Sequence, residues 1–593
     1  MMMRDWIRTA SLQDRIIAIF LVLWILTSLA ALAGMYHLWW TRERVLYGNK
    51  DIYEQRIVVC KRAGISLEIL KEGEKIDRTW PRYLNYRAVG NHDQLSYVKY
   101  LLIPRIPSGE GNILLTEKDG KLYTNTDYPE KGLISGYPSK VSGLLLSFLS
   151  LWGMVILGRR YFSMKNLSFP EGIAVVCLLL TLFTLLSRSL SGTATYGFWL
   201  TSALGICGWV VWSSQIPDYV RDFRDKRYLD WGRYFHEGRF LSIALILFIF
   251  IIAMVFLWSI LMSVVVVPDD WDAWAIWGAK AKVLALGQGP LLDVTHFDQA
   301  DYPLLWPSLW AFSGWWAGGW EENWSRAWGP IFMLLCACEI GIIIQRLSHN
   351  NTLGFLGAAL FVSIPMVPLI SSWSYAEAPL WLMMICSFGY LLSWRKGDQW
   401  QQLIVGGLFA TAAAYTKNEG LFYASLGLIW ILSCRPKNLF IACVLYITPL
   451  LLLYTPWFLW IRTALHLKSH ALLGLNLDYH TLVRALHRLM PTAKSIAIMW
   501  ADVRQWNIVL WGLLLSSVYL GFVKGNDGRS RLLVPVLMLF SSFIIVIFHP
   551  SDVHWLVAAS WNRITTQTLP LFLVVIIPSL SMRADSRNLT HED

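Results

Sequence analysis

Three carboxylates stand within four positions at the point where a long apolar segment ends. Residues 241–267 carry no charged side chain and are long enough to cross a bilayer. Asp269, Asp270 and Asp272 follow directly, with tryptophans among and after them. Because tryptophan is enriched at the membrane–water interface, the three acids are expected at the membrane surface. Carboxylates at that level suit proton transfer with a substrate that is carried by a lipid.

Further polar side chains stand at the ends of later apolar segments. In chain order they are Asp301, Tyr302, Glu377, Lys417, Glu419 and Arg563. Charged groups at membrane depth are costly and by default indicate a functional site. A carboxylate can take the proton from an attacking hydroxyl or amine, while lysine or arginine neutralises the charge on a departing phosphate. The set therefore predicts group transfer from a phosphate-linked donor at the outer face.

The acids are the candidates for catalysis. Asp270 and Asp272 are preferred as the general base, because Asp269 directly follows a proline and is better placed as a cap or hinge. Glu377 is a further catalytic candidate. A structural role is open for each: one of the three aspartates could cap the stretch 273–286, which looks amphipathic, and Glu377 could cap its own helix.

The cations are the candidates for contact with the donor phosphate. Lys417 and Arg563 are expected at one cavity, but Lys417 could instead pair with Glu419, and Arg563 could meet a lipid phosphate. Lys280 is a further candidate on the amphipathic stretch. Lys280 and Lys282 could also extend along apolar surface so that their ammonium groups reach lipid headgroups.

Composition indicates a polytopic membrane protein. Of 593 residues 55% are hydrophobic and only 15% are charged, and the mean hydropathy is +0.45. The net charge of +11 does not indicate a nucleic-acid partner, because the basic residues lie mostly in short loops on one side. Of the eight cysteines only Cys60 falls in a polar segment, and no metal-ligand spacing appears. The interfacial acids leave open a divalent metal, Mg²⁺ or Mn²⁺.

Hydropathy predicts about fourteen membrane spans. Lysine and arginine then fall on one side of the membrane if both termini are cytoplasmic, which indicates the orientation. The expected spans are 15–37, 140–158, 170–188, 195–214, 240–267, 326–346, 352–371, 377–394, 402–416, 420–434, 438–461, 507–523, 531–548 and 566–582.

The spans divide the chain into five parts, one of them a soluble domain outside the membrane. Short apolar runs such as 56–60, and a hairpin-like pattern around Asp119-Gly120, predict that this domain is α+β or β-rich. We expect it to recognise an acceptor or partner and to do no chemistry, although an exported spacer or docking module would read the same way in the sequence. The expected parts are an anchor (1–37), the outer domain (38–139), additional spans with a cytoplasmic loop (140–239), a membrane core (240–582) with an outer loop (268–325), and a cytoplasmic tail (583–593).

The order of the motifs in 240–582 resembles that of the C-type glycosyltransferases, among them the protein O-mannosyltransferases and the lipid A aminoarabinose transferase. In that family an acidic motif after a span precedes an interface helix and a segment ending in Pro-Leu. The matching positions here are the acidic cluster, Asp301-Tyr302-Pro303-Leu304, Glu377-Ala378-Pro379, Thr416-Lys417-Asn418-Glu419-Gly420, Pro456-Trp457 followed by Arg462, and Trp561-Asn562-Arg563. Residues 1–239 have no counterpart in the resemblance.

The resemblance implies an all-helical polytopic enzyme of the bacterial inner membrane that serves the cell envelope. It would transfer a sugar, with inversion, from a polyprenyl-phosphate donor to a glycan, lipid or protein acceptor on the extracytoplasmic face. Tyr302, Glu419 and Arg462 would join the donor site. Asp301 stands where the family has a cation, and the acidic motif reads Asp-Asp-Trp-Asp rather than a plain Asp-Glu.

Two other functions remain open from the sequence. An O-antigen polymerase or ligase with a diphosphate-linked donor would have a similar span count, but such enzymes usually depend on outer-loop arginines. A lipid or solute transporter would need ionisable residues at mid-membrane and broken helices in paired halves, and the sequence has no such pairing.

Overall fold

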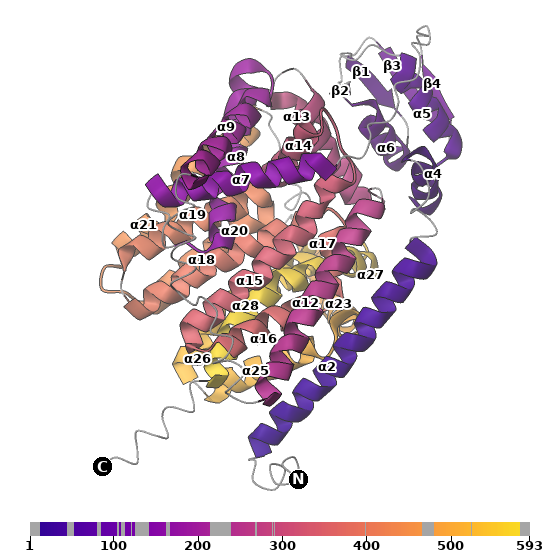
Figure 1. The fold of residues 1–593 in the computed structure, drawn as a ribbon. Helices are drawn as coiled ribbons and strands as arrows, with labels where there is room; N and C mark the ends of the chain where they lie inside the picture. Colours follow the sequence, from indigo (N-terminus) through magenta and orange to yellow (C-terminus); the bar gives the residue numbers. More distant parts are fainter. Residues whose placement is uncertain are drawn as a thin grey trace, which may run out of the picture.

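Helices dominate the computed structural model, and a small sheet lies at one end of the molecule (Figure 1). The described residues are 12–581, with breaks at 44–51, 64, 80–84, 90, 104–105, 108–112, 120, 125–140, 162–166, 214–238, 267, 269, 288, 290, 398, 465–478 and 524. The predicted cytoplasmic tail therefore falls outside the described residues.

The outer domain is an α+β unit, as predicted. Its strands lie in the order β2-β1-β3-β4, with β1 parallel to both β2 and β3 and with β3 antiparallel to β4. The predicted hairpin is β3–β4, and Asp119 in its turn has a φ of 53°. The apolar run 56–60 lies in a helix rather than a strand. The elements are α4 (Ile52–Ala63), α5 (Leu67–Thr79), β1 (Asn85–Val89), α6 (His92–Leu102), β2 (Ile106–Pro107), β3 (Ile113–Lys118) and β4 (Lys121–Thr124).

The helices outside the resemblance pack tightly on one another. Gly153 of α7 approaches α9 so closely that a Cβ on Gly208 would lie 1.8 Å from the Gly153 carbonyl oxygen. Small residues at such crossings let helix backbones come into contact within a membrane. The helices before the core are α2 (Leu12–Leu38), η1 (Trp39–Glu43), α7 (Val141–Tyr161), α8 (Phe169–Ser191) and α9 (Thr195–Ser213).

The core follows as a bundle in which α15 and α18 are largely buried. Its first half comprises α12 (Arg239–Val265), η3 (Asp272–Gly278), α13 (Ala279–Leu286), η4 (Leu291–Thr295), α14 (Leu305–Trp316), η5 (Trp324–Ala327), α15 (Trp328–Ser348), α16 (Asn351–Val362), α17 (Met366–Ser372) and α18 (Glu377–Gly397). Its second half comprises α19 (Trp400–Thr416), α20 (Asn418–Cys434), α21 (Leu439–Pro449), η6 (Leu450–Tyr454), α22 (Thr455–Leu459), η7 (Trp460–Ala464), α23 (Tyr479–Ala501), α24 (Val503–Trp506), α25 (Val509–Val523), α26 (Gly525–Phe548), α27 (Val553–Leu556), η9 (Val557–Trp561) and α28 (Asn562–Ser581).

Several of these helices can cross a membrane. Within the described residues, seven are long and apolar enough, and α16 with α17 forms one further candidate that is bent by 65°. All of the predicted spans contain helix. An all-helical membrane body is therefore confirmed, whereas length and composition by themselves support seven or eight spans.

The sequence suggested that the stretch 273–286 is an amphipathic helix on the membrane surface, and this prediction is wrong. It forms η3 and α13 and is almost completely buried, because α6 of the outer domain and α14 cover it. Lys280 and Lys282 are buried as well and do not reach headgroups. The Lys280 ammonium donates to the carbonyls of Gln299 and Tyr302, and thereby ties α13 to the middle of the outer loop.

Lys280 should make the stability of the protein depend on pH. Burial lowers its pKa to about 7, although Asp301 and Asp298 act in the opposite direction. An unfolded lysine keeps its proton to about pH 10, so between these values the unfolded state binds more protons and the free energy of unfolding rises with pH. The full slope is about 1.4 kcal/mol per pH unit.

We therefore expect Lys280→Met to flatten this rise between about pH 7 and 10. The measurement is the apparent Tm of the full chain in detergent across that range. Lys121→Met, at an exposed lysine, is the matched control and should keep the wild-type slope. A Lys280→Met variant with the wild-type slope would contradict the assignment.

Candidate active site

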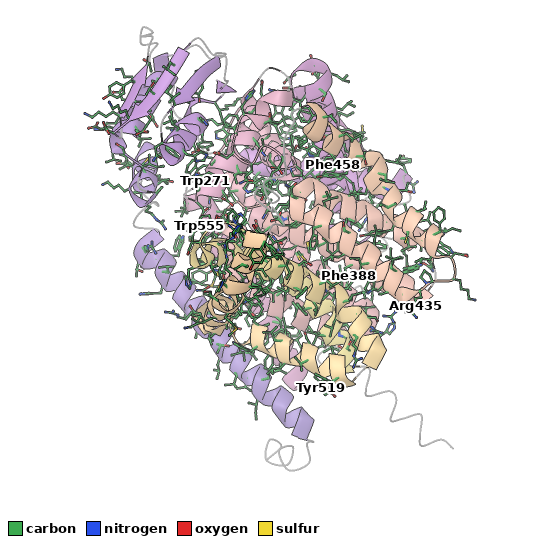
Figure 2. All side chains as sticks on the ribbon, turned by 180° about the vertical axis from the view of Figure 1, so that it is seen from behind. Trp271, Phe388, Arg435, Phe458, Tyr519 and Trp555 are labelled. Carbon is green, nitrogen blue, oxygen red and sulfur yellow. The ribbon has the colours of Figure 1, made fainter. Side chains whose placement is uncertain are left out.

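A cavity of about 1360 Å³ opens beside the acidic cluster. Residues from the outer loop, α20, α22, α26, α28 and the outer domain line it. Three of its residues, Trp271, Phe458 and Trp555, lie in the half of the body nearer the sheet, whereas Arg435 and Tyr519 lie toward the opposite end (Figure 2). A concave site with aromatic walls and a few polar groups is typical of a binding site for a small substrate.

Charges of alternating sign form a chain along this cavity. The Arg563 guanidinium donates to Asp272, and its Nε lies 3.8 Å from Glu377 Oε1. The Lys417 ammonium lies 2.8 Å from Glu377 and 2.9 Å from Glu419. Asp272, Glu419 and Arg563 line the cavity, while Glu377 and Lys417 lie behind them and are almost inaccessible to solvent. Five residues from four distant segments of the chain thus form one network.

The ends of the helices bring these groups together. Glu377 is the first residue of α18 and Arg563 the second of α28, whereas Lys417 stands alone between α19 and α20 in an extended conformation. The turn after Lys417 is tight, since a Cβ on Gly420 would lie 2.0 Å from the Ala413 carbonyl oxygen. Only glycine fits this approach, and it lets the lysine point across to α18.

The partners of Asp270 and Asp301, the other acids at the cavity, include a hydroxyl and an amide group. Asp270 accepts a hydrogen bond from the Tyr375 hydroxyl and receives the Asp272 backbone N–H at 3.4 Å. Asp301 accepts from Asn418 Nδ2 at 2.8 Å. The Arg563 guanidinium lies 5.0 Å from the centre of the Tyr375 ring, so this tyrosine adjoins both Asp270 and the cation chain. The sequence analysis did not single out Tyr375.

Tyr302 lies at the cavity wall as predicted, and its ring stacks on Trp277 at 5.3 Å. Burial raises the pKa of the Tyr302 phenol, and the Glu419 carboxylate adds to that effect. The hydroxyl therefore stays protonated and is a hydrogen-bond donor rather than a base.

A buried arginine that the sequence did not single out fixes the acidic turn. Arg326 donates to the Val266 carbonyl and the Ser374 hydroxyl, and its second terminal nitrogen donates to the Ser372 carbonyl at 3.0 Å. It thereby ties the end of α12, which precedes Asp270, to the turn that precedes Glu377. Arginine suits this role because its planar fork of donors satisfies several carbonyls at once.

Several polar atoms around the cavity have no hydrogen-bond partner among the described residues. Such atoms are rare in folded proteins, and each calls for an explanation such as a ligand or an ordered water. They are Trp271 Nε1, Trp274 Nε1, Gln299 Oε1, Glu419 Oε2, Asn562 Oδ1 and both terminal atoms of Gln567, with Glu377 Oε2 just behind.

Of the predicted site residues, most meet at this cavity. Those that line it are Asp270, Asp272, Tyr302, Glu419 and Arg563, and Glu377 with Lys417 supports them from behind. Lys280 does not line it, since its ammonium is held by loop carbonyls. Asp269 and the side chain of Arg462 fall outside the described residues.

The geometry bears on the helix-cap and ion-pair roles that the sequence left open for these residues. Asp272 bonds Arg563 and is not used as a helix cap, whereas the Asp270 carboxylate accepts the Asp272 backbone N–H at the start of η3, as a cap would. Lys417 does pair with Glu419, and equally with Glu377. Within the described part of the chain, no group of three or more His, Cys, Asp or Glu side chains could hold a metal ion. The Mg²⁺ or Mn²⁺ expectation stays a prediction and enters no step below.

The geometry as a whole suits proton transfer next to a group that can neutralise an anion. It places carboxylates and the Arg563 guanidinium together at the wall of one aromatic cavity. Comparison of the chain with protein-family models gives no match, and comparison with curated proteins gives none either.

Proposed function

We propose that the protein is a membrane glycosyltransferase that transfers a sugar from a polyprenyl-phosphate donor to an acceptor on the extracytoplasmic face. The observation that carries the proposal is the chain from Asp272 through Arg563 and Glu377 to Lys417, at a cavity whose wall also holds Asp270. Buried charges of both signs at one level are what transfer from a phosphate leaving group requires.

Asp270 and Asp272 then have different roles. The Arg563 guanidinium engages Asp272, and Asp270 lines the same cavity, so Asp270 is assigned as the base. It takes the proton as the acceptor hydroxyl or amine attacks the anomeric carbon. The bond from that carbon to the phosphate oxygen breaks with inversion, and its electron pair leaves on the phosphate. Arg563 turns from Asp272 to the phosphate and neutralises this charge.

The phosphate needs a favourable route, because the site holds more carboxylates than cations. A second cavity of about 1060 Å³ shares Ala558 and Asn562 with the first. Its walls carry Lys494 and His554 on a largely apolar surface, together with Arg504, which is paired with Asp502. A lipid phosphate with a polyprenyl chain fits such a surface. Asn562, which lines both cavities, directly precedes Arg563 in the sequence.

The proposed enzyme would have about fourteen spans, with both termini on the cytoplasmic side of a bacterial inner membrane. The start of α2 and the helices α25 and α26 lie at the end of the body away from the outer domain, which supports this orientation (Figure 1). The additional helices α7, α8 and α9 would belong to the same membrane body.

One observation favours a second candidate, transport of a lipid or solute. The bent pair α16–α17 is a broken span, and Glu339 is buried within the spanning helix α15. Glu339 has a nearby partner, since it accepts from Ser168 at 2.5 Å. Proteoliposomes distinguish the two functions: a transferase consumes a lipid-phosphate sugar without moving it across the membrane, whereas a transporter moves it intact.

The first prediction separates the two aspartates. Asp270→Asn keeps the shape but removes the proton acceptor, so transfer should fall by about 10²–10⁴ while donor binding survives. Asp272→Asn frees Arg563 from its partner and should change the donor KM more than Asp270→Asn does. The assay uses the full chain in nanodiscs, radiolabelled polyprenyl-phosphate hexoses and pentoses, and envelope extract as the acceptor source. Asp270→Asn turning over at the wild-type rate would reject this base.

The second prediction concerns the cations. Arg563→Ala should raise the donor KM at least about tenfold, since a charge-assisted contact to phosphate is lost. Lys417→Met leaves Glu377 buried without its lysine, which costs about 3–5 kcal/mol and should lower the Tm. Adding Glu377→Gln removes the unpaired charge and should recover much of that Tm. If Lys417→Met is as stable as the wild type, the pair does not support the site.

The third prediction tests the orientation. In intact cells an impermeant thiol reagent should label Lys121→Cys, which is exposed in the outer domain, and should not label Lys437→Cys. The wild-type chain gives the background from its own cysteines. Lysed cells should label both variants. Labelling of Lys437→Cys in intact cells, or protection of Lys121→Cys there, would reverse the topology.

A further inference from the structure

The outer domain is docked on the helix that carries Asp272. One stripe of α6 provides the contact, with His92, Ser96, Tyr97 and Tyr100 at helical spacing. His92 and Ser96 both bond Asp298, at 3.0 and 2.9 Å. The Tyr97 ring meets Trp274 edge-on at 5.1 Å, and α6 packs along η3. Figure 1 shows α6 on the side of the outer domain that faces α13.

A buried polar cluster fixes this docking. Glu322 accepts from the Tyr100 hydroxyl at 2.5 Å and from Arg56 at 3.3 Å, and Arg56 also meets Glu74 at 2.7 Å. From the other side, Lys282 donates to the Tyr100 carbonyl at 3.1 Å. Burial acts to raise the pKa of Glu322, but Arg56 and Lys282 outweigh it and the pKa is lowered. Separating such partners leaves buried charges unpaired, which is strongly unfavourable.

The docked domain forms part of the cavity wall. Ala63 and Ile65, at the turn between α4 and α5, line the cavity together with His92. The His92 ring lies 6.1 Å from the Trp271 ring, with the two planes tilted by 31°. Trp271 stands between Asp270 and Asp272 in sequence. The outer domain therefore contacts Trp271, the residue that follows the proposed base Asp270 in the sequence.

The unpartnered atoms on this side of the cavity indicate the chemistry of the molecule that binds there. Trp271 Nε1 is a donor and Gln299 Oε1 an acceptor, and neither has a partner among the described residues. A hydroxyl group both donates and accepts, so neighbouring hydroxyls can satisfy the two atoms together. The partly buried Trp271 ring offers apolar surface on the cavity wall, and the buried Trp274 packs edge-on behind it. Several hydroxyls around an apolar face describe a sugar ring.

We propose that the acceptor is a carbohydrate, bound in the cavity against Trp271, Gln299 and His92 of the outer domain. This inference rests on the proposed transferase function, and it assigns the acceptor side of the same cavity. The domain, which sequence reasoning could describe only as a recognition module, is then half of the acceptor site. His92 is a binding residue of this site and takes no part in proton transfer.

The first experiment measures binding without turnover. Saturation-transfer NMR on the full chain in nanodiscs uses neutral gluco-, galacto-, manno- and N-acetylglucosamine oligosaccharides as probes. At least one should bind, and His92→Ala and Trp271→Phe should each weaken it roughly tenfold, equal to about 1.4 kcal/mol. Lys121→Ala in the same domain and Trp199→Phe on α9, both at exposed positions, are the controls and should bind as the wild type. No binding by any probe, or equal binding by all four variants, overturns the proposal.

The second experiment separates this inference from the function on which it rests. With the probe that binds as acceptor and a polyprenyl-phosphate sugar as donor, His92→Ala should raise the acceptor KM with a far smaller effect on kcat. Transfer to a serine- or threonine-containing peptide or to an amino lipid, and to no oligosaccharide, overturns the carbohydrate assignment while the transferase stands. Oligosaccharide binding that depends on Trp271, without consumption of any donor, rejects the transferase and supports a carbohydrate site.

Discussion

The membrane core depends on how one buried carboxylate is paired. Glu377 begins α18 with no exposure to solvent, and an isolated charge there would be prohibitively costly. Lys417 from the α19–α20 turn and Arg563 from the start of α28 both approach it. Three helices are thereby held at one level, and Arg563 extends the pairing to Asp272 on the outer loop. The same contacts that stabilise the bundle position Asp272, Glu419 and both cations of the candidate site.

This arrangement could be predicted from the sequence in its main lines. Glu377, Lys417 and Arg563 each stand at the end of an apolar segment, and segments of alternating direction bring such ends to one face. The predicted direction of each segment was therefore enough to place these three residues at one end of the bundle. The order of charges could not be predicted, because which carboxylate each cation contacts depends on turn geometry, such as the close approach at Gly420.

The outer loop was harder to predict for a physical reason. Periodicity distinguishes a polar from an apolar helix face, but it does not reveal what covers the polar one. Lys280 and Lys282 look like the solvent side of an interfacial helix, yet α6 and loop carbonyls bury them. His92 carries no signal of its own, since it lies in a separate domain and joins the cavity only through docking.

The place of the outer domain in the chain has a kinetic consequence. It is inserted between α2 and α7, so both of its ends continue into helices of the body. Its encounter with the outer loop is therefore intramolecular, at an effective concentration on the order of millimolar. An interface that opened to release a bulky product would close again without a diffusional search. A permanent tether of this kind lets the contact remain small, because avidity rather than intrinsic affinity keeps the two halves of the cavity together.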